Sequence, residues 1–471
     1  MNTKQKTLDE YKALLDGSSV AYQRLNALFD EGTFLETGRF VKRSTTPADE
    51  KAGSEFESVV TGYGAIEGRL VFAYAQDPSR MKGAMSEAQA KKIVALYDAA
   101  MKAGAPVVAI IDSIGAKVEE GVAVLAGYGK IMKSVSAASG VIPQIAVVCG
   151  TCNGSMATIA SMCDISIATK DAKFYISSPF VLAANGGKGM GTADKAAASG
   201  SISGVCADAS EAIACAKSII NLLPSNNVEG CAYTETTDTM NRTVSAASLE
   251  EIADAGSVVE LSAANAPEMK TALGSVGGMT VGFVAASGKL SPFGARKIAK
   301  FVAFCDSFSL PVVTLVDSEG TVIGAEEENV PFSAKLAQLA AVYASSTNAK
   351  VTVITGKAIG AAFTLLGSKA LGADVVLATE NATIGAMPTE AAVEFLYGKT
   401  IRTSLNSAEE KANCTALYEN DIASPVNAAR NGDIDDVIPT EEIRIRIAAA
   451  LEMLSAKATA DPYKKHGNLP L

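Results

Sequence analysis

Two short segments of small residues offer backbone groups, rather than side chains, for chemistry. Residues 152–157 read CNGSMA and residues 358–363 read AIGAAF, and each stands between a strand-like apolar run and a helical pattern. Small residues let a ligand approach the main chain, and the first N–H groups of a helix point outward unpaired. Such a turn can form an oxyanion hole, with about 3 to 4 kcal/mol per donor for a developing enolate or oxyanion. Close helix–sheet packing would also explain one such turn, but two at matched positions favour a functional role.

Side chains offer little acid–base chemistry. His466, close to the C-terminal end, is the one histidine, so an imidazole base, a Ser-His-Asp triad and a histidine zinc site are not expected. Glu119, Glu120 and residues 326–328 are the acid candidates, although charge runs of this kind are usually a solvated face.

Other motifs predict no metal site and no nucleotide site. Cys149 and Cys152 form a C-x-x-C pair without a second pair, so we interpret them as packed thiols. Asp164 and Asp374, at two helix–strand junctions, are interpreted as structural. No phosphate-binding G-x-x-x-x-G-K-[ST] is present, and no G-x-G-x-x-G stands between a strand and a helix.

Composition predicts a globular protein with two cores of ordinary size. The chain has 471 residues, of which 48% are hydrophobic and 20% charged. Its 41 Lys plus Arg against 51 Asp plus Glu, a formal charge of −10, disfavour nucleic-acid binding. The absence of an apolar signal segment predicts a cytoplasmic protein, with docking to a membrane complex left open, and its eight cysteines are expected to be reduced.

The elements that would position the turns follow an α/β pattern. We expect helices in the first 40 residues, a hairpin over 59–75 and a mobile surface loop over 185–203. Helices are predicted over 86–103, 122–137, after residue 154 and over 440–456. Short buried strands are predicted over 107–111, 144–148 and 165–168.

The second half of the chain repeats the first. Four pairs of segments match in the same order, about 205 to 225 positions apart: 30–36 with 254–260, 64–68 with 274–278, 90–93 with 295–298, and 106–113 with 311–318. A repeat this long indicates a duplicated domain rather than a solenoid. We place the boundary in the turn-rich segment 223–248, which gives domains over residues 1–235 and 236–471.

Further segments carry a family resemblance. Residues 112–122, 125–129, 139–145, 223–227 and 464–471 resemble the carboxyltransferase subunit of biotin-dependent acyl-CoA carboxylases and decarboxylases. The chain is most similar to the propionyl-CoA carboxylase β type and the methylmalonyl-CoA decarboxylase α type, essentially from end to end. The resemblance implies an α/β fold of two tandem crotonase-like (ClpP/crotonase) ββα-superhelix domains.

The resemblance also implies roles for individual residues. In the first turn it implies a hole for the acyl-CoA thioester enolate at Gly154 and Ser155. In the second it implies a hole for the biotin ureido oxyanion at Gly360, Ala361 and Ala362. Contacts with CoA or biotin are implied at Gly115, Ala116, Lys117, Ser178, Pro179 and Thr364.

The implied reaction moves a carboxyl group between carboxybiotin and the α-carbon of a short acyl-CoA, most simply propionyl-CoA or methylmalonyl-CoA. Biotin would be attached to a partner, not to this chain. The implied partners are a biotin carrier protein and either a biotin carboxylase subunit or the membrane subunit of a sodium-pumping decarboxylase. The implied assembly is a homo-oligomer, from dimer to hexamer.

Several positions depart from the family's usual residues. Ser155 and Ala361 stand where the family has glycine, Thr364 stands where an acid commonly sets acyl-chain preference, and segments 318–320 and 183–200 are altered. Two alternatives therefore remain open. One is a crotonase-like hydratase or hydrolase, which needs a positioned glutamate, and the other is an assembly scaffold that retains CoA binding.

Overall fold

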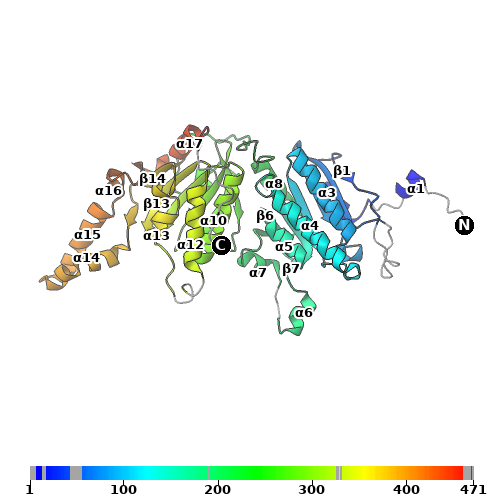
Figure 1. Cartoon of the computed structure of the whole chain (residues 1–471). Helices are drawn as coiled ribbons and strands as arrows, with labels where there is room; N and C mark the ends of the chain where they lie inside the picture. The colour runs from blue at the N-terminus through cyan, green and yellow to red at the C-terminus, as the bar shows by residue number, and fades with distance from the viewer. Residues whose placement is uncertain are drawn as a thin grey trace. The chain divides into compact units, whose positions relative to one another are not determined.

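The structure, a computed structural model of the chain, describes residues 7–12, 17–42, 56–187, 191–324, 328, 331–459 and 468. Its internal contacts divide the chain into two compact units, Met1–Glu229 and Gly230–Leu471 (Figure 1). The division falls inside the turn-rich segment 223–248. Each unit has its own sheet and is described by itself.

An eight-stranded sheet forms the centre of the first unit, in the order β1-β2-β3-β4-β5-β6-β8 with β7 paired to β5. The strands are β1 (Leu35–Thr37), β2 (Val59–Ile66), β3 (Arg69–Gln76), β4 (Val107–Ser113), β5 (Gln144–Asn153), β6 (Ile165–Thr169), β7 (Lys173–Tyr175) and β8 (Gly204–Cys206). β2 and β3 form the predicted antiparallel hairpin, and every pairing from β3 onward is parallel. Parallel strands buried on both faces explain the continuous apolar runs of the sequence.

Helices accompany this sheet, and the longer ones bury apolar side chains against it. The helices are α1 (Leu8–Lys12), α2 (Val20–Leu28), α3 (Glu87–Ala103), α4 (Val122–Ala138), α5 (Ser155–Met162), α6 (Pro179–Ala184), α7 (Ala193–Ala198) and α8 (Ala209–Leu222). α3 begins where the Ser86 hydroxyl accepts the Gln89 N–H, and it ends at Gly104 in the left-handed conformation, φ 62°. Both are ordinary helix caps, so local sequence sets the helix ends.

The second unit repeats this topology. Its sheet has the order β16-β14-β13-β12-β11-β10-β9, with β15 paired to β13. The strands are β9 (Val259–Leu261), β10 (Met269–Val276), β11 (Met279–Ala286), β12 (Val312–Ser318), β13 (Lys350–Ile359), β14 (Val375–Thr379), β15 (Thr383–Gly385) and β16 (Asp436–Ile438). The order of the strands and their pairing match the first unit, so the predicted duplication is confirmed.

The connection between β15 and β16 carries longer helices than the corresponding connection between β7 and β8 in the first unit. The helices of the second unit are α9 (Leu249–Ile252), α10 (Pro292–Ser307), α12 (Phe332–Ser345), α13 (Ala361–Leu365), α14 (Thr389–Thr403), α15 (Ser407–Leu417), α16 (Pro425–Arg430) and α17 (Ile443–Met453). α14 and α15 run side by side away from the sheet (Figure 1). A π-helical turn, Tyr418–Ile422, follows α15 directly.

A carboxylate closes the hairpin turn in each unit. Asp30 accepts the N–H groups of Glu67 and Gly68 at 3.1 and 3.0 Å. Asp254 accepts those of Gly277 and Gly278 at 2.9 and 2.8 Å. The repeated aspartate therefore has the same structural task in both copies, which its place in the sequence repeat did not reveal.

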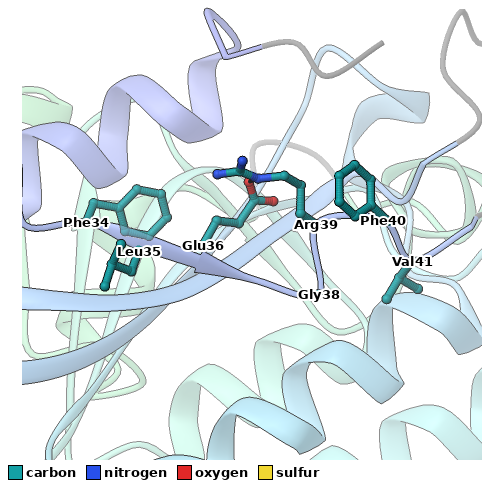
Figure 2. Close-up of a pocket in the computed structure, with 7 residues that line it drawn as sticks. All are labelled: Phe34, Leu35, Glu36, Gly38, Arg39, Phe40 and Val41. Atoms are coloured by element: carbon teal, nitrogen blue, oxygen red, sulfur yellow. Dashed lines mark hydrogen bonds and ion pairs between the residues drawn. The ribbon is translucent and has the colours of Figure 1, made fainter. Parts of the chain in front are cut away.

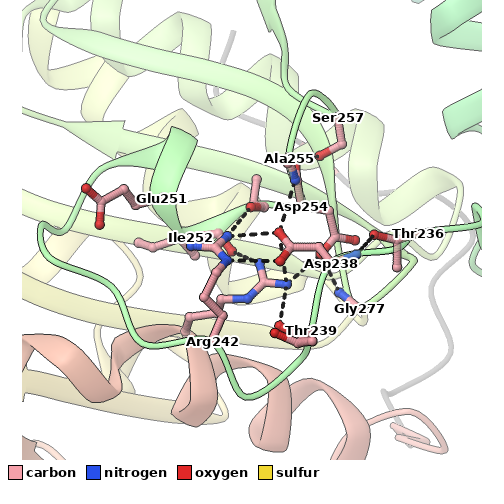
Figure 3. Close-up of polar contacts among 12 residues, drawn as sticks. Thr236, Asp238, Thr239, Arg242, Glu251, Ile252, Asp254, Ala255, Ser257 and Gly277 are labelled. Atoms are coloured by element: carbon pink, nitrogen blue, oxygen red, sulfur yellow. Dashed lines mark hydrogen bonds and ion pairs between the residues drawn. The ribbon is translucent and has the colours of Figure 1, made fainter.

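The second unit adds a buried arginine to this cap. Arg444 of α17 is fully buried and donates to the Asp254 carboxylate at 2.6 Å. Asp238 lies 3.7 Å from Arg444 and accepts two hydrogen bonds from Arg242 at 3.0 Å each (Figure 3). Burial by itself raises the pKa of Asp254, but the hydrogen bonds from Arg444, Gly278, Ser275 and Gly277 lower it below its usual value. The network joins α17, the hairpin and the segment before α9.

A buried lysine occupies the same place in each repeat. The Lys92 ammonium donates to the Val59 carbonyl at 2.5 Å, and the Lys297 ammonium donates to the carbonyls of Ser262 and Asn265 at 2.8 and 2.9 Å. Burial lowers the pKa of each lysine to about 8. These lysines hold the chain beside the second strand of each sheet.

Two expectations for loops and helices need correction. The first 40 residues are not all helical, because β1 pairs with β2 at the sheet edge. The segment over 185–203 contains the helix α7, whose Thr192 hydroxyl accepts the Lys195 N–H, so small residues there form a capped helix rather than only a loop. Residues 188–190 of that segment lie outside the described residues.

Candidate active site

The first glycine turn joins β5 to α5 through an unusual backbone conformation. Gly154 has φ 62° and ψ −129°, a region that residues with a side chain rarely adopt. Its N–H donates to the carbonyl of Tyr175 in β7 at 2.9 Å. Gly154 therefore contributes the shape of the turn, and its own N–H is already used inside the sheet.

The free donors of this turn follow Gly154. The Gly154 carbonyl accepts the N–H groups of Ala157 and Thr158 at 3.0 and 3.4 Å. Within the described chain, the N–H groups of Ser155 and Met156 bond to no acceptor. They are the first groups of an eight-residue helix, so they carry the positive end of its dipole.

The loop after β4 lies against this turn. The Asn153 side-chain amide donates to the Ile114 carbonyl at 2.9 Å, and a side chain at Gly115 would contact that same amide. The loop is also held by Met85, which donates to the Gly115 carbonyl and accepts from the Lys117 N–H, both at 2.8 Å. Three residues predicted as CoA or biotin contacts, Gly115, Ala116 and Lys117, are thus brought beside Gly154.

The Lys117 side chain does not reach into solvent. It is 1% exposed, and its ammonium lies 3.6 Å from the Glu120 carboxylate, which is 6% exposed. Glu120 also accepts the Glu87 N–H at 2.6 Å. The expectation that Glu119 and Glu120 form a solvated face is therefore wrong for Glu120, because an internal ion pair retains it.

Ser178 and Pro179 begin α6, shortly after β7. The Ser178 hydroxyl accepts the Val181 N–H at 3.4 Å, so it serves as the helix cap. Phe180 and Ile176 beside them are 83% and 69% exposed. Large apolar side chains this exposed next to a glycine turn are typical of a surface that another molecule covers.

The second glycine turn has nearly the same geometry. Gly360 has φ 55° and ψ −122°, and its N–H donates to the Gly385 carbonyl in β15 at 2.8 Å. No acceptor in the described ranges bonds to the N–H groups of Ala361 or Ala362. Thr364 is exposed one helical turn later, and its hydroxyl donates to the Gly360 carbonyl at 3.4 Å.

A repeated aspartate accepts a backbone N–H from the strand that leads to each turn. Asp112 accepts the Thr151 N–H at 3.1 Å, and Asp317 accepts the Lys357 N–H at 2.8 Å. The register between the two central strands shifts at both places. A side chain at Gly150 would collide with the Asp112 carboxylate, so this glycine is required. Both aspartates lie near the ends of the repeated segments 106–113 and 311–318, and the available signal was a glycine four residues before each turn glycine, Gly150 and Gly356.

The remaining polar candidates are structural. Asp164 and Asp374 accept the first N–H of a neighbouring strand, from Gln144 and Lys350, at 2.8 Å each, which confirms their interpretation. Burial raises the pKa of the Cys149 thiol to about 11, so it stays protonated. Residues 326 and 327, His466 and most of 464–471 lie outside the described residues.

A groove at the sheet edge has one carboxylate among the described residues that line it (Figure 2). It is lined by Phe34, Leu35, Glu36, Gly38, Arg39, Phe40 and Val41. The Glu36 carboxylate accepts from Arg39 at 2.8 Å and from the Tyr22 hydroxyl. Burial, then this hydrogen bond, raise the pKa of Tyr22. The carboxylate is already paired, and neither glycine turn lines the groove.

Two structural absences bound the chemistry. Among the described residues, no group of three or more His, Cys, Asp or Glu side chains could hold a metal ion. Across the same part of the chain, no helix is both long and apolar enough to cross a membrane.

Two copies of one α/β unit, each with a glycine turn between a long parallel strand and a helix, define a crotonase-like carboxyltransferase fold. The family model described as "Carboxyl transferase domain" matches residues 12–469. The chain belongs to this family. The resemblance seen in the sequence is thereby confirmed, and so is the predicted crotonase-like fold.

Known relatives cover the chain from end to end. It is 34% identical to the methylmalonyl-CoA carboxyltransferase 12S subunit of Propionibacterium freudenreichii subsp. shermanii, over 96% of this chain and 92% of that one. It is 36% identical to the methylmalonyl-CoA decarboxylase subunit alpha of Propionigenium modestum, over 97% and 94%. A hexameric transcarboxylase 12S crystal structure with methylmalonyl-coenzyme A and methylmalonic acid bound is similar with a TM-score of 0.92 and 34% identity, covering 98% and 94%.

Proposed function

We propose that this chain is the carboxyltransferase subunit of a biotin-dependent complex. It moves a carboxyl group between carboxybiotin on a partner carrier protein and the α-carbon of a short-chain acyl-CoA, with propionyl-CoA and methylmalonyl-CoA as the leading pair. The names of the relatives support this reaction class. The observation that carries the proposal is the pair of glycine turns with matching conformations and free N–H donors.

The two turns would serve two halves of one transfer. We assign the acyl-CoA to the first domain, residues 1–235, where the N–H groups of Ser155 and Met156 would stabilise the thioester enolate. We assign biotin to the second, residues 236–471, where those of Ala361 and Ala362 would stabilise the ureido oxygen. Each well-aimed donor is worth about 3 to 4 kcal/mol.

This division of labour fits a chain with one histidine. When bound, biotin supplies the carboxyl group and a ring nitrogen that can act as the base, so no protein side chain is needed for proton transfer. The residues present fit that requirement because they offer backbone donors and close approach. The chain contributes orientation, charge stabilisation and exclusion of water.

Neighbouring residues would set CoA binding and substrate preference. Gly115, Ala116 and Lys117 lie beside the first turn, and the Ala116 N–H has no acceptor in the described structure. We assign this loop, with Ser178 and Pro179, to the CoA thioester. Thr364, one turn after Gly360, is assigned to acyl-chain preference because it replaces the family's usual acid.

The proposed assembly is a homo-oligomer, with a hexamer as the leading form. A similar structure is described as a hexamer assembly. The exposed Phe180 and Ile176 beside the first turn supply an apolar surface for a second copy. The biotin carrier protein would join this core, together with either a biotin carboxylase subunit or a membrane decarboxylase subunit.

The decarboxylase complex is the second candidate. It rests on the 36% identity to a methylmalonyl-CoA decarboxylase subunit alpha, against 34% for the propionyl-CoA carboxylase beta chain of Saccharopolyspora erythraea. Co-purification with tagged chain from its natural host separates the two. A biotin carboxylase partner supports carboxylation, and an integral membrane partner supports decarboxylation.

The reaction itself is tested with purified chain and free biotin in place of the carrier. Methylmalonyl-CoA, malonyl-CoA and glutaconyl-CoA are incubated separately, and the decarboxylated thioesters are measured by liquid chromatography. Biotin-dependent conversion of at least one, with methylmalonyl-CoA fastest, is expected. No conversion of any of them, with CoA binding retained, would favour the scaffold alternative.

A further inference from the structure

A tyrosine that follows α15 reaches β15, the strand that accepts the N–H of Gly360. Tyr418 stands at the start of the π-helical turn after α15 and is 3% exposed. We propose that Tyr418 is a positioning residue for Gly360. This inference rests on the proposed function, because it assigns Tyr418 to the biotin half of the transfer.

Three backbone hydrogen bonds connect the π-helical turn to the glycine turn. The Ala423 N–H donates to the Tyr418 carbonyl at 2.8 Å, which closes the wide turn. The Ile384 N–H of β15 donates to the Ala423 carbonyl at 2.9 Å. The next residue, Gly385, accepts the Gly360 N–H at 2.8 Å. The segment that ends the π-helical turn and the glycine turn therefore form hydrogen bonds with adjacent residues of β15, Ile384 and Gly385.

The Tyr418 hydroxyl fills the space that a side chain at Gly385 would need. A β-carbon at Gly385 would lie 2.9 Å from the Tyr418 hydroxyl oxygen and 3.8 Å from the Ile359 Cδ1. No hydrogen bond to this hydroxyl is found among the described residues, so its contribution is contact rather than pairing. Because interiors are close-packed, the Tyr418 side chain limits where Gly385 can lie, with its hydroxyl at the tip, nearest to Gly385, and its ring as the larger part of the side chain.

The corresponding strand of the first unit, β7, has a tyrosine where β15 has Gly385. Tyr175 holds the strand position that corresponds to Gly385, since Asn153 pairs with Tyr175 as Ile359 pairs with Gly385. Its carbonyl accepts the Gly154 N–H. In both units a later segment accepts an N–H of this strand, since the Phe174 N–H donates to the Gly191 carbonyl at 2.8 Å. The tyrosine comes from the strand itself in the first unit, where its ring packs against Gly191, and from the π-helical turn in the second, where it packs against Gly385.

The test introduces a collision at Gly385 and then relieves it by a second substitution at Tyr418. Gly385→Ala places a methyl group against the Tyr418 hydroxyl and displaces β15. Because a misplacement of about 1 Å can cost as much as roughly 10²-fold in rate, we expect at least a tenfold loss in biotin-dependent kcat. Tyr418→Phe alone should lose about twofold or less. The double variant should recover most of the loss, because the methyl group then occupies the space of the hydroxyl.

A second measurement separates positioning from folding. Val393 lies fully buried in the same helical cluster as Tyr418, and it is not among the three nearest neighbours of a β-carbon at Gly385. Val393→Ala should lower the melting temperature and leave kcat unchanged. Tyr418→Ala should lower kcat at least tenfold and leave the Kd for methylmalonyl-CoA unchanged, because that ligand is assigned to the first turn.

The outcomes distinguish this inference from the proposed function. An active wild-type chain with an unaffected Gly385→Ala variant, or with no rescue by Tyr418→Phe, overturns the role of Tyr418 only. A Val393→Ala variant that loses as much rate as Tyr418→Ala also overturns it, since general loosening would explain both. A wild-type chain without biotin-dependent turnover removes both proposals.

Discussion

Replacement of Gly154 by alanine isolates the contribution of turn shape to the reaction. A methyl group there would meet only the Ile176 carbonyl oxygen, at 3.9 Å, so it causes no collision. The cost comes from the backbone, because φ 62° with ψ −129° is unfavourable for a residue with a side chain. Strain of this kind costs about 1 to 3 kcal/mol. The variant either loses this amount of stability or relaxes the backbone, which changes the direction of the N–H groups in the turn.

The expected effect on rate is larger than the effect on stability. Re-aiming the turn moves the N–H groups of Ser155 and Met156, and loss of one oxyanion donor costs about 10²- to 10³-fold in kcat. Urea unfolding reports the free energy of unfolding, and liquid chromatography reports propionyl-CoA formed from methylmalonyl-CoA with free biotin. We expect a stability loss of about 1 to 3 kcal/mol together with a rate loss of at least about 10²-fold.

The chain offers a matched control at Gly121. It precedes α4 with φ 56° and ψ −125°, and a methyl group there would meet nothing within 4 Å. Gly121→Ala should therefore cost the same stability and keep most of the rate. Full activity in Gly154→Ala with the expected strain would refute the donor assignment. An equal rate loss in Gly121→Ala would assign the effect to strain alone.

Three further outcomes are expected. Arg444→Met leaves the buried Asp254 carboxylate without its charged partner and should cost about 3 to 5 kcal/mol in urea unfolding, whereas the exposed ion pair of Arg446 with Asp436 should be worth at most about 1 kcal/mol. Equal costs would contradict the importance of burial. The pKa of Lys92 and of Lys297 is about 8 in the folded protein and 10.5 in the unfolded chain, so between these pH values the unfolded chain binds more protons. The free energy of unfolding of the wild type, relative to Lys92→Met or Lys297→Met, should therefore rise from pH 8 to pH 10.5. A difference independent of pH would contradict their burial as free amines. Thr364→Ala should change the kcat/KM ratio of methylmalonyl-CoA to malonyl-CoA by roughly tenfold, and an unchanged ratio would remove Thr364 from acyl selection.

Local patterns predicted much of the fold. The apolar runs, caps and Gly-punctuated hairpin of the first unit are short-range signals, and their elements formed as expected. The sequence repeat predicted matching topology in the second unit. β1 escaped prediction because its identity as a strand depends on pairing with β2, which lies beyond a segment of more than twenty residues.

The features of the site that the sequence did not predict depend on contacts between residues far apart in the chain. Nothing in the run around Glu120 indicates that Lys117 retains it inside the protein. The link between Asp112 and Thr151, and that between Tyr418 and Gly385, join different elements of the fold. Periodicity describes one element at a time, so it cannot predict such pairs.

The central claim is that two glycine turns serve two halves of one biotin-dependent transfer. It is tested most directly by the rate of propionyl-CoA formation from methylmalonyl-CoA, with and without free biotin, in wild type and in Ala361→Val. The account predicts that the wild-type rate requires biotin and that Ala361→Val loses the biotin-dependent rate while it still binds methylmalonyl-CoA. A wild-type rate that is the same without biotin, or an Ala361→Val variant with full biotin-dependent activity, would contradict it.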